Sequence, residues 1–391
     1  MLSGCLLMGA ACGGEETTDG PTAESVAQQY AAVVYALYTD THAAAEDLEV
    51  AVKALVAAPS AATLDAARAA WRAARVPYGQ TEAFRFAGGP IDAEDGPEGR
   101  LNSWPLDEAY IDYVATASTS GIVNDPSIAL TASNLAGLNE GGGGDVLGMG
   151  QGFNEEKAIS TGYHAIEFIL WGQDTSANGP GDRPYTDFLT GAEATAPNGD
   201  RRGEYLVVVT ELLVADLATL VEAWAPDADN YRREFLTQDP NEALKQIVAP
   251  MGILAKGELA GERMDVALDT RDQEDEHSCF SDNTHVDIQM NAQGIENVYL
   301  GTYRSVSGPS VQALLRSMDP TLEASVTAKM TEVMSAVMAI EAPFDQAISD
   351  PDSAGYQQIS TAVDDLFDLG DLMAEVGPAL GLGTISVALP E

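Results

Sequence analysis

Positive charge is scarce in this chain, which has 19 basic residues, only five of them lysines, against 61 acidic ones, for a formal net charge of −42. Such a surface repels phosphate backbones, so we expect no nucleic-acid partner. It also offers no basic patch for docking on anionic lipid. It attracts cations and stays soluble in salt, which is typical of proteins from salt-adapted organisms.

Several catalytic signatures are missing as well. The chain has no His-Glu-x-x-His, no Gly-x-Ser-x-Gly, no Walker loop and no Cys-x-x-Cys. Their absence excludes the standard zinc-protease helix, the serine-hydrolase elbow, a P-loop and the common iron–sulfur and thioredoxin-like spacings. No run of eighteen apolar residues occurs, so the sequence predicts no membrane-spanning helix.

Aromatic residues make up only 7% of the chain, whereas alanine is abundant in its long segments, and this composition favours packed helices over a β-sandwich. Apolar residues recur at spacings of three and four, as they do on the buried face of a helix. Ser60 is expected to cap one such helix. The predicted helical segments are 24–38, 42–57, 61–75, 159–170, 206–224, 322–340 and 353–376.

Loops rich in glycine and proline divide these helical segments into two halves. We therefore predict an all-α fold of two packed helical bundles. The predicted parts are a signal remnant and tether at 1–22, an N-terminal bundle at 23–176, a linker loop at 177–202 and a C-terminal bundle at 203–391.

The N-terminus has a short apolar run that ends in small residues and cysteine, like a bacterial lipoprotein signal. The polar stretch after Cys12 would suit a tether, so Cys12 is the predicted lipidation site, with Cys5 as the alternative. No basic residue precedes this run, so the true start of the signal stays open. The third cysteine, Cys279, is expected to be a buried apolar residue.

Histidine is the most informative residue type, because the chain has only four. His42 reads as a surface residue. His164 and Glu167 are three apart in an apolar helical segment, so both side chains point to one side and can bind one cation. Segment 275–287 holds two further histidines among acids, and Glu82 and Arg85 form a third polar pair beside aromatic residues. Taken alone, each cluster also fits a purely structural hydrogen bond or a surface ion pair.

In four ordered blocks the sequence resembles the imelysin family, over a span from about residue 24 to the end. The blocks read WRAARVPYGQTEAFRFAGGPID, GYHAIEFILWGQD, RRGEYL and EDEHSCFSDNTHVDI, and the second contains the family's Gly-x-His-x-x-Glu signature at residues 162–167. The resemblance implies two facing helical bundles with a site at their interface. It also implies export to the cell envelope, as a periplasmic or surface-exposed lipoprotein, with links to iron supply.

Carried onto this chain, the resemblance makes His164, Glu167, Glu82 and Asp282 the expected metal ligands, and Arg85, Ser281 and His285 further ligand-binding residues. The metal would be iron or zinc. The expected partners are that metal ion or its chelate, the bacterial membrane through the lipid anchor, and other iron-uptake proteins of the envelope.

Three functions fit these residues. A binding protein would capture a metal ion or chelate, with Arg85 holding an anionic chelator or orienting Glu82. A metallopeptidase would need three protein ligands, an open position and a base, for which only Glu82 is available. An interaction scaffold would use the same polar clusters only to dock the two bundles. All three depend on one spatial prediction, which is that the clusters meet in a single pocket between the bundles.

Overall fold

The computed structural model describes residues 20–176 and 179–389, and in this part of the chain nearly all regular structure is helical. The predicted lipidation sites Cys5 and Cys12 lie outside the described residues. The long helices are α1 (Ala23–Ala57), α2 (Ala61–Thr81), α6 (Gly162–Trp171), α7 (Gly199–Trp224), α9 (Pro240–Ile253), α11 (Thr284–Leu300), α13 (Pro320–Met338) and α15 (Ala354–Ala379). None of the described helices is both long and apolar enough to cross a membrane.

Shorter elements join them. The short α-helices are α3 (Glu98–Asn102), α4 (Glu108–Ile111), α5 (Ala132–Leu138), α8 (Tyr231–Thr237), α10 (Val266–Thr270), α12 (Val311–Met318) and α14 (Phe344–Ser349). A 3₁₀ turn, η1 (Glu82–Phe84), follows α2, and a π-helix, η8 (Leu254–Asp265), joins α9 to α10. The two short strands β1 (Thr302–Tyr303) and β2 (Val306–Ser307) form an antiparallel hairpin after α11. The all-α prediction is confirmed.

Local sequence explains the helix ends. Ser60 caps α2 as predicted, because its hydroxyl accepts from the backbone N–H of Thr63 while Thr63 returns a bond to the Ser60 backbone. The two predicted alanine-rich segments before it form one continuous helix, α1, since no glycine or proline interrupts them.

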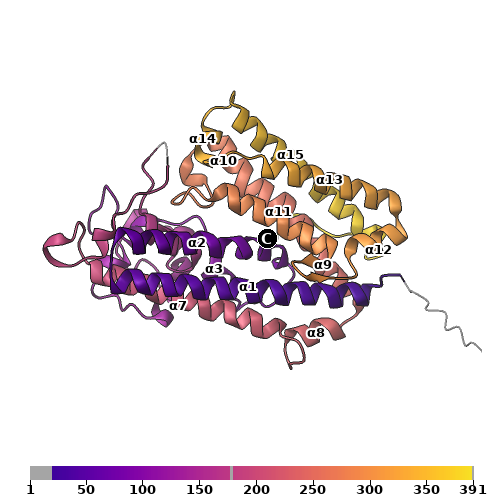
Figure 1. The fold of residues 1–391 in the computed structure, drawn as a ribbon, viewed down its shortest axis with the longest axis horizontal. Helices are drawn as coiled ribbons and strands as arrows, with labels where there is room; N and C mark the ends of the chain where they lie inside the picture. Colours follow the sequence, from indigo (N-terminus) through magenta and orange to yellow (C-terminus); the bar gives the residue numbers. More distant parts are fainter. Residues whose placement is uncertain (1–19, 177–178, 390–391) are drawn as a thin grey trace, which may run out of the picture.

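The helices assemble into two groups, which lie side by side in Figure 1. In the first group α1 packs against α2 and α7, and α6 packs against α2 and α7. In the second group α15 packs against α9, η8 and α13, and α11 packs against α13. The predicted boundary at residue 203 falls inside α7, and α7 packs with the N-terminal helices. The two groups therefore do not coincide with the predicted halves 23–176 and 203–391.

The predicted linker 177–202 is also partly built into the fold. Arg183 and Asp187 are 4% and 1% exposed, and the Arg183 guanidinium donates to Asp112, which also accepts from Arg202. A segment that buries paired charges is held in place, because an unpaired buried charge would be costly. The high glycine and proline content of this segment indicates loops, but these loops are packed ones.

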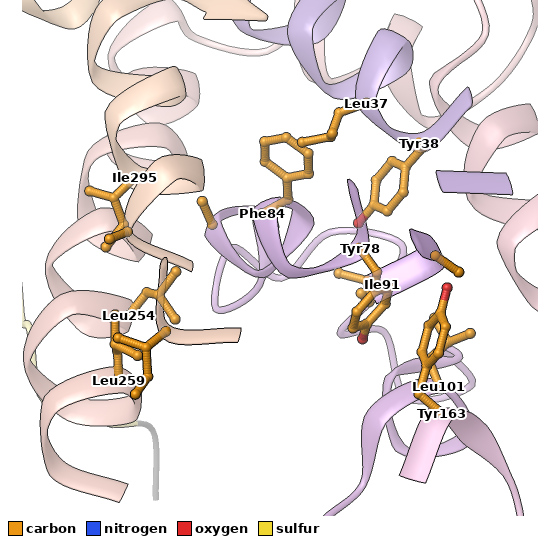
Figure 2. Close-up of a cluster of buried hydrophobic side chains, with 14 of the residues drawn as sticks. Leu37, Tyr38, Tyr78, Phe84, Ile91, Leu101, Tyr163, Leu254, Leu259 and Ile295 are labelled. Carbon is orange, nitrogen blue, oxygen red and sulfur yellow. The ribbon is translucent and has the colours of Figure 1, made fainter. Parts of the chain in front are cut away.

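One hydrophobic core runs through both groups. Figure 2 shows Phe84 of η1 near Leu37 and Tyr38 of α1, with Leu254 and Leu259 of η8 and Ile295 of α11 nearby. The groups approach closely where α2 meets α11, because a Cβ on Gly294 would lie 2.3 Å from the backbone oxygen of Gln80. Only glycine permits this approach, which brings the end of α2 and η1 against the second group.

Candidate functional site at the helical interface

The signature helix α6 starts at a position that requires glycine. Gly162 has a φ of 88°, and a Cβ on it would lie 2.6 Å from the backbone oxygen of Leu101. A side chain is therefore excluded at this position, and the close neighbour is the backbone of α3. Trp71 of α2 donates to the backbone oxygen of Tyr163 at 2.9 Å, so α6 is fixed on two sides.

The signature pair forms as predicted and is fully buried. His164 Nδ1 lies 3.0 Å from Glu167 Oε2, with the two side chains 1% and 0% exposed. Glu167 Oε1 accepts from the backbone N–H and the hydroxyl of Ser281, at 3.0 and 2.6 Å. Burial lowers the pKa of His164 well below its usual value and raises the pKa of Glu167 to about 8. Both Glu167 oxygens thus have partners, whereas His164 Nε2 has none among the described residues.

A second histidine–carboxylate pair lies beside the first. His277 Nδ1 is 2.8 Å from Asp287 Oδ2, and the His164 and His277 rings meet edge to face with centroids 4.6 Å apart. Burial, with Arg263 nearby, lowers the pKa of His277 to about 4, so its imidazole is neutral at pH 7. Neutral His277 therefore donates Nδ1–H to Asp287 and presents a lone pair at Nε2, as metal-ligating histidines do.

Asp287 is the anchor of this second pair. It accepts from Arg75 at 3.1 and 3.0 Å, and both side chains are 1% exposed. Burial by itself would raise the pKa of Asp287, but Arg75 and His277 outweigh it and hold that pKa well below its usual range. Arg75, His277 and Asp287 all lie in the blocks that resemble the imelysin family, but sequence reasoning did not place them in the site.

Glu82 and Arg85 meet as predicted, within a network of buried charges. Glu82 Oε2 lies 2.9 Å from Arg85 and 2.6 Å from Arg263, while Glu258 accepts from Arg263 at 2.8 Å. Burial would raise the pKa of Glu82, but Arg263 and Arg85 hold it below its usual value. Arg85 also pairs with Glu98 of α3 at 3.0 Å. Arg263 and Glu258 were not predicted, and both are carried by the π-helix η8.

The four predicted metal ligands do not come together as one coordination group. Glu167 is bound to Ser281 and Glu82 is bound to two arginines, as described above. Across residues 20–176 and 179–389, no group of three or more His, Cys, Asp or Glu side chains is arranged to hold a metal ion. The structure instead gives two histidine–carboxylate pairs and a separate ion-pair network.

These two parts meet at a cavity of about 270 Å³ between the helical groups. Its charged lining residues are Arg85, Glu98, Glu140, Glu258, Glu262 and Arg263, and Asn102, Ser103, Trp104 and His277 complete most of the wall. A larger hollow of about 740 Å³ lies between α13 and α15, but neither a histidine nor an arginine lines it. Of these two, only the smaller cavity is lined by an imidazole and by arginines, and we call it the interface cavity.

Asp282 and His285 do not line the interface cavity. Asp282 is half-buried, and burial together with Asp345 and Asp174 raises its pKa to about 7. Its φ of 55° is in the left-handed region, which Asp and Asn tolerate better than other non-glycine residues. These two predicted site residues therefore lie at the margin of the site.

The raised pKa of Asp282 predicts a pH-dependent cost. A carboxyl that binds its proton more tightly in the folded state destabilises the fold increasingly as pH rises from about 4 to about 7. We expect Asp282→Asn to raise the free energy of unfolding at pH 8, because it removes a half-buried negative charge that Asp345 and Asp174 repel. Partial exposure to water screens this repulsion, so the gain should be only about 1 kcal/mol. Urea unfolding at pH 8 and pH 4 checks this, and the gain should vanish at pH 4. An equal gain at both pH values would contradict it.

Comparison with known proteins agrees with the fold. The family model described as imelysin matches residues 34–373. Iron-regulated protein A of Synechococcus elongatus is 26% identical over 329 residues, which cover 82% of this chain and 76% of that protein. A candidate iron-regulated protein A precursor from Parabacteroides distasonis has a similar structure, with a TM-score of 0.68, 20% identity, and coverage of 93% of this chain and 97% of the other. An imelysin-like protein from Psychrobacter arcticum aligns with a TM-score of 0.64 at 15% identity, over 94% and 98% of the two chains. The chain belongs to the imelysin family.

Proposed function

We propose that this protein captures a metal cation as cargo in the interface cavity, as part of iron supply at the cell envelope. The observation that carries the proposal is the neutral imidazole of His277, which is fixed by Asp287 on the wall of a cavity otherwise rich in carboxylates. Imidazole and carboxylate are the donors that first-row transition metals accept from proteins. The names of the relatives, which include iron-regulated protein A, support iron as that metal.

The charge of the cavity also supports a cation. Its lining carries the carboxylates of Glu98, Glu140, Glu258 and Glu262 against the guanidiniums of Arg85 and Arg263, and buried Glu82 adds one further negative charge behind them. Low-dielectric walls strengthen such an excess of one sign. The net charge of −42 extends the same attraction over the whole surface.

In this proposal the signature pair positions other groups. His164 does not line the interface cavity, but its ring packs edge to face against the ring of His277. Glu167 connects His164 to the backbone of Ser281, close to the segment that carries His277. Such outer partners of a ligating imidazole typically change metal affinity by about 10- to 100-fold. The signature would thus act by holding the second histidine in place.

Peptidase chemistry is the alternative suggested by the family name. A zinc peptidase needs three protein ligands and an open coordination position. The described residues offer no such group of three. We therefore propose that the protein binds a metal cation and does not cleave peptides. A lipid anchor and a location in the cell envelope are part of the same proposal.

The test is metal binding by the full chain. We expect anaerobic titration with Fe²⁺ to show one site, and His277→Ala to weaken it by about tenfold or more, because the only cavity-lining imidazole is removed. His42→Ala is the matched control, since His42 does not line the interface cavity and lies 3.8 Å from Glu46 of its own helix. Equal affinity for the two variants would refute the assignment, and no Fe²⁺ or Zn²⁺ binding by the wild type would favour a structural scaffold.

A further inference from the structure

The interface cavity is too large for a bare ion. A water molecule occupies about 30 Å³ of liquid, so a cavity of about 270 Å³ has room for a cation with six small ligands around it. The side chains around it are also not gathered for direct coordination, since no three His, Cys, Asp or Glu residues of the described chain form a metal-holding group. The size of the cavity and the arrangement of its donors therefore both fit a cation that carries ligands of its own.

The lining has more acceptor oxygens than donors without a partner, although Arg85 Nε and Asn102 Nδ2 are buried donors that lack one. Within the described chain, Oε2 of Glu98, Glu140 and Glu258 has no hydrogen-bond partner, and neither oxygen of Glu262 has one. The guanidinium NH groups of Arg85 and Arg263 that make contacts are directed at carboxylates and at Asn291. A guest that donates several hydrogen bonds would match this wall.

A buried acceptor lies among these carboxylates. His277 is 2% exposed and lines the cavity, and its only hydrogen bond in the described structure is the one from Nδ1 to Asp287. Its Nε2 is thus an unpartnered acceptor beside the ring of Trp104, whose centroid is 5.7 Å from that of His277. The side chain is buried, but it lies on the cavity wall, so its Nε2 can accept a hydrogen bond from a guest in the cavity.

We infer that the interface cavity binds a metal cation with its inner shell of water or amine ligands intact, and that the protein holds this shell through hydrogen bonds to carboxylates and to His277 Nε2. This inference rests on the proposed function and specifies its ligand. Metal-bound water donates strong hydrogen bonds to anions. The negative lining would reject anionic chelates such as ferric citrate.

Hexaamminecobalt(III) tests this directly, because its six ammonia ligands do not exchange and it can bind only through its outer face. We expect the full-length protein to bind one equivalent, measured by titration calorimetry at about 0.2 M salt to screen the acidic surface. Hexaamminecobalt(III) should displace Mn²⁺ from the same site, whereas ferric citrate should not bind.

The variant Glu140→Gln, Glu262→Gln removes two exposed cavity carboxylates that make no ion pair in the described structure, so folding should be unaffected. We expect it to weaken hexaamminecobalt(III) binding at least tenfold. The matched control Glu341→Gln, Glu375→Gln removes the same charge from exposed sites outside the cavity and should change affinity less than twofold.

The outcomes separate the two claims. If Mn²⁺ and Fe²⁺ bind and depend on His277, but hexaamminecobalt(III) does not bind, the inner shell is lost on binding and the inference is overturned while the proposed function stands. Equal weakening by both double variants would mean general surface attraction and would also overturn it. If no cation binds at all, both claims fail.

Discussion

Replacing Asp112 by alanine should lower the free energy of unfolding by about 3–5 kcal/mol, because two buried guanidiniums would lose their shared carboxylate. Asp112 lies 2.8 Å from Arg183 and 2.6 Å from Arg202, and all three side chains are no more than 1% exposed. This cluster joins α7 to the segment that follows the signature helix α6. Chemical unfolding at pH 7, followed by far-UV circular dichroism, measures the loss.

Asp364→Ala is the control for the Asp112 variant, since Asp364 is exposed on α15 and should change stability by less than about 0.5 kcal/mol. A loss below about 1 kcal/mol for Asp112→Ala would show that water replaces the missing carboxylate. In that case the packed connection between α6 and α7 would not depend on buried charge.

Replacing Asp287 by alanine should have a comparable effect on stability, and a second effect on binding. Arg75 would keep one hydrogen bond, to Asn102 Oδ1 at 2.5 Å, and its contacts with three aromatic rings, but its buried charge would lose its carboxylate partner. We expect a loss of about 3–5 kcal/mol. His277 would also lose the group that fixes its ring, so Fe²⁺ affinity should fall by about 10- to 100-fold in the molecules that remain folded.

The two effects of Asp287→Ala can be separated by comparison with Arg75→Met. Methionine fills part of the space of Arg75 and removes its charge, but leaves the His277–Asp287 bond in place. We expect Arg75→Met to lower stability and to preserve more of the Fe²⁺ affinity than Asp287→Ala does. The same loss of affinity in both variants would show that binding follows overall stability, not the orientation of His277.

Periodic helices were the most predictable part of the fold. Segments 206–224 and 322–340 carry regular apolar spacing. The first lies within α7, which begins earlier, at Gly199, and the second matches α13 to within two residues at each end. Helix α11 was not predicted, because it buries Asn291, Gly294 and Asn297 beside its apolar residues, which are Ile288, Ala292, Ile295, Val298 and Tyr299. Asn291 donates to the backbone oxygen of Gly79 at 2.9 Å, so part of the buried surface of α11 pairs with polar groups of α2 and gives no apolar signal in the sequence.

The site residues could be predicted only where helical spacing or the blocks that resemble the imelysin family identified them. His164 with Glu167, and Glu82 with Arg85, are three residues apart, so helical geometry alone joins them. The bond between His277 and Asp287 spans a turn, and the choice between Asp282 and Asp287 as the inward acid depends on how that turn folds. Arg263 and Glu258 lie on a π-helix, whose side chains do not follow the 3.6-residue period, so no spacing rule locates them.

Anomalous diffraction from crystals of the full-length protein soaked in Mn²⁺ would locate the bound cation. We expect a single strong peak inside the interface cavity, within hydrogen-bonding reach of Glu258, Glu262 and His277 through the metal's own ligands. A peak on His164 and Glu167 with no density in the cavity, or a peak only near Asp174 and Asp282, would contradict it.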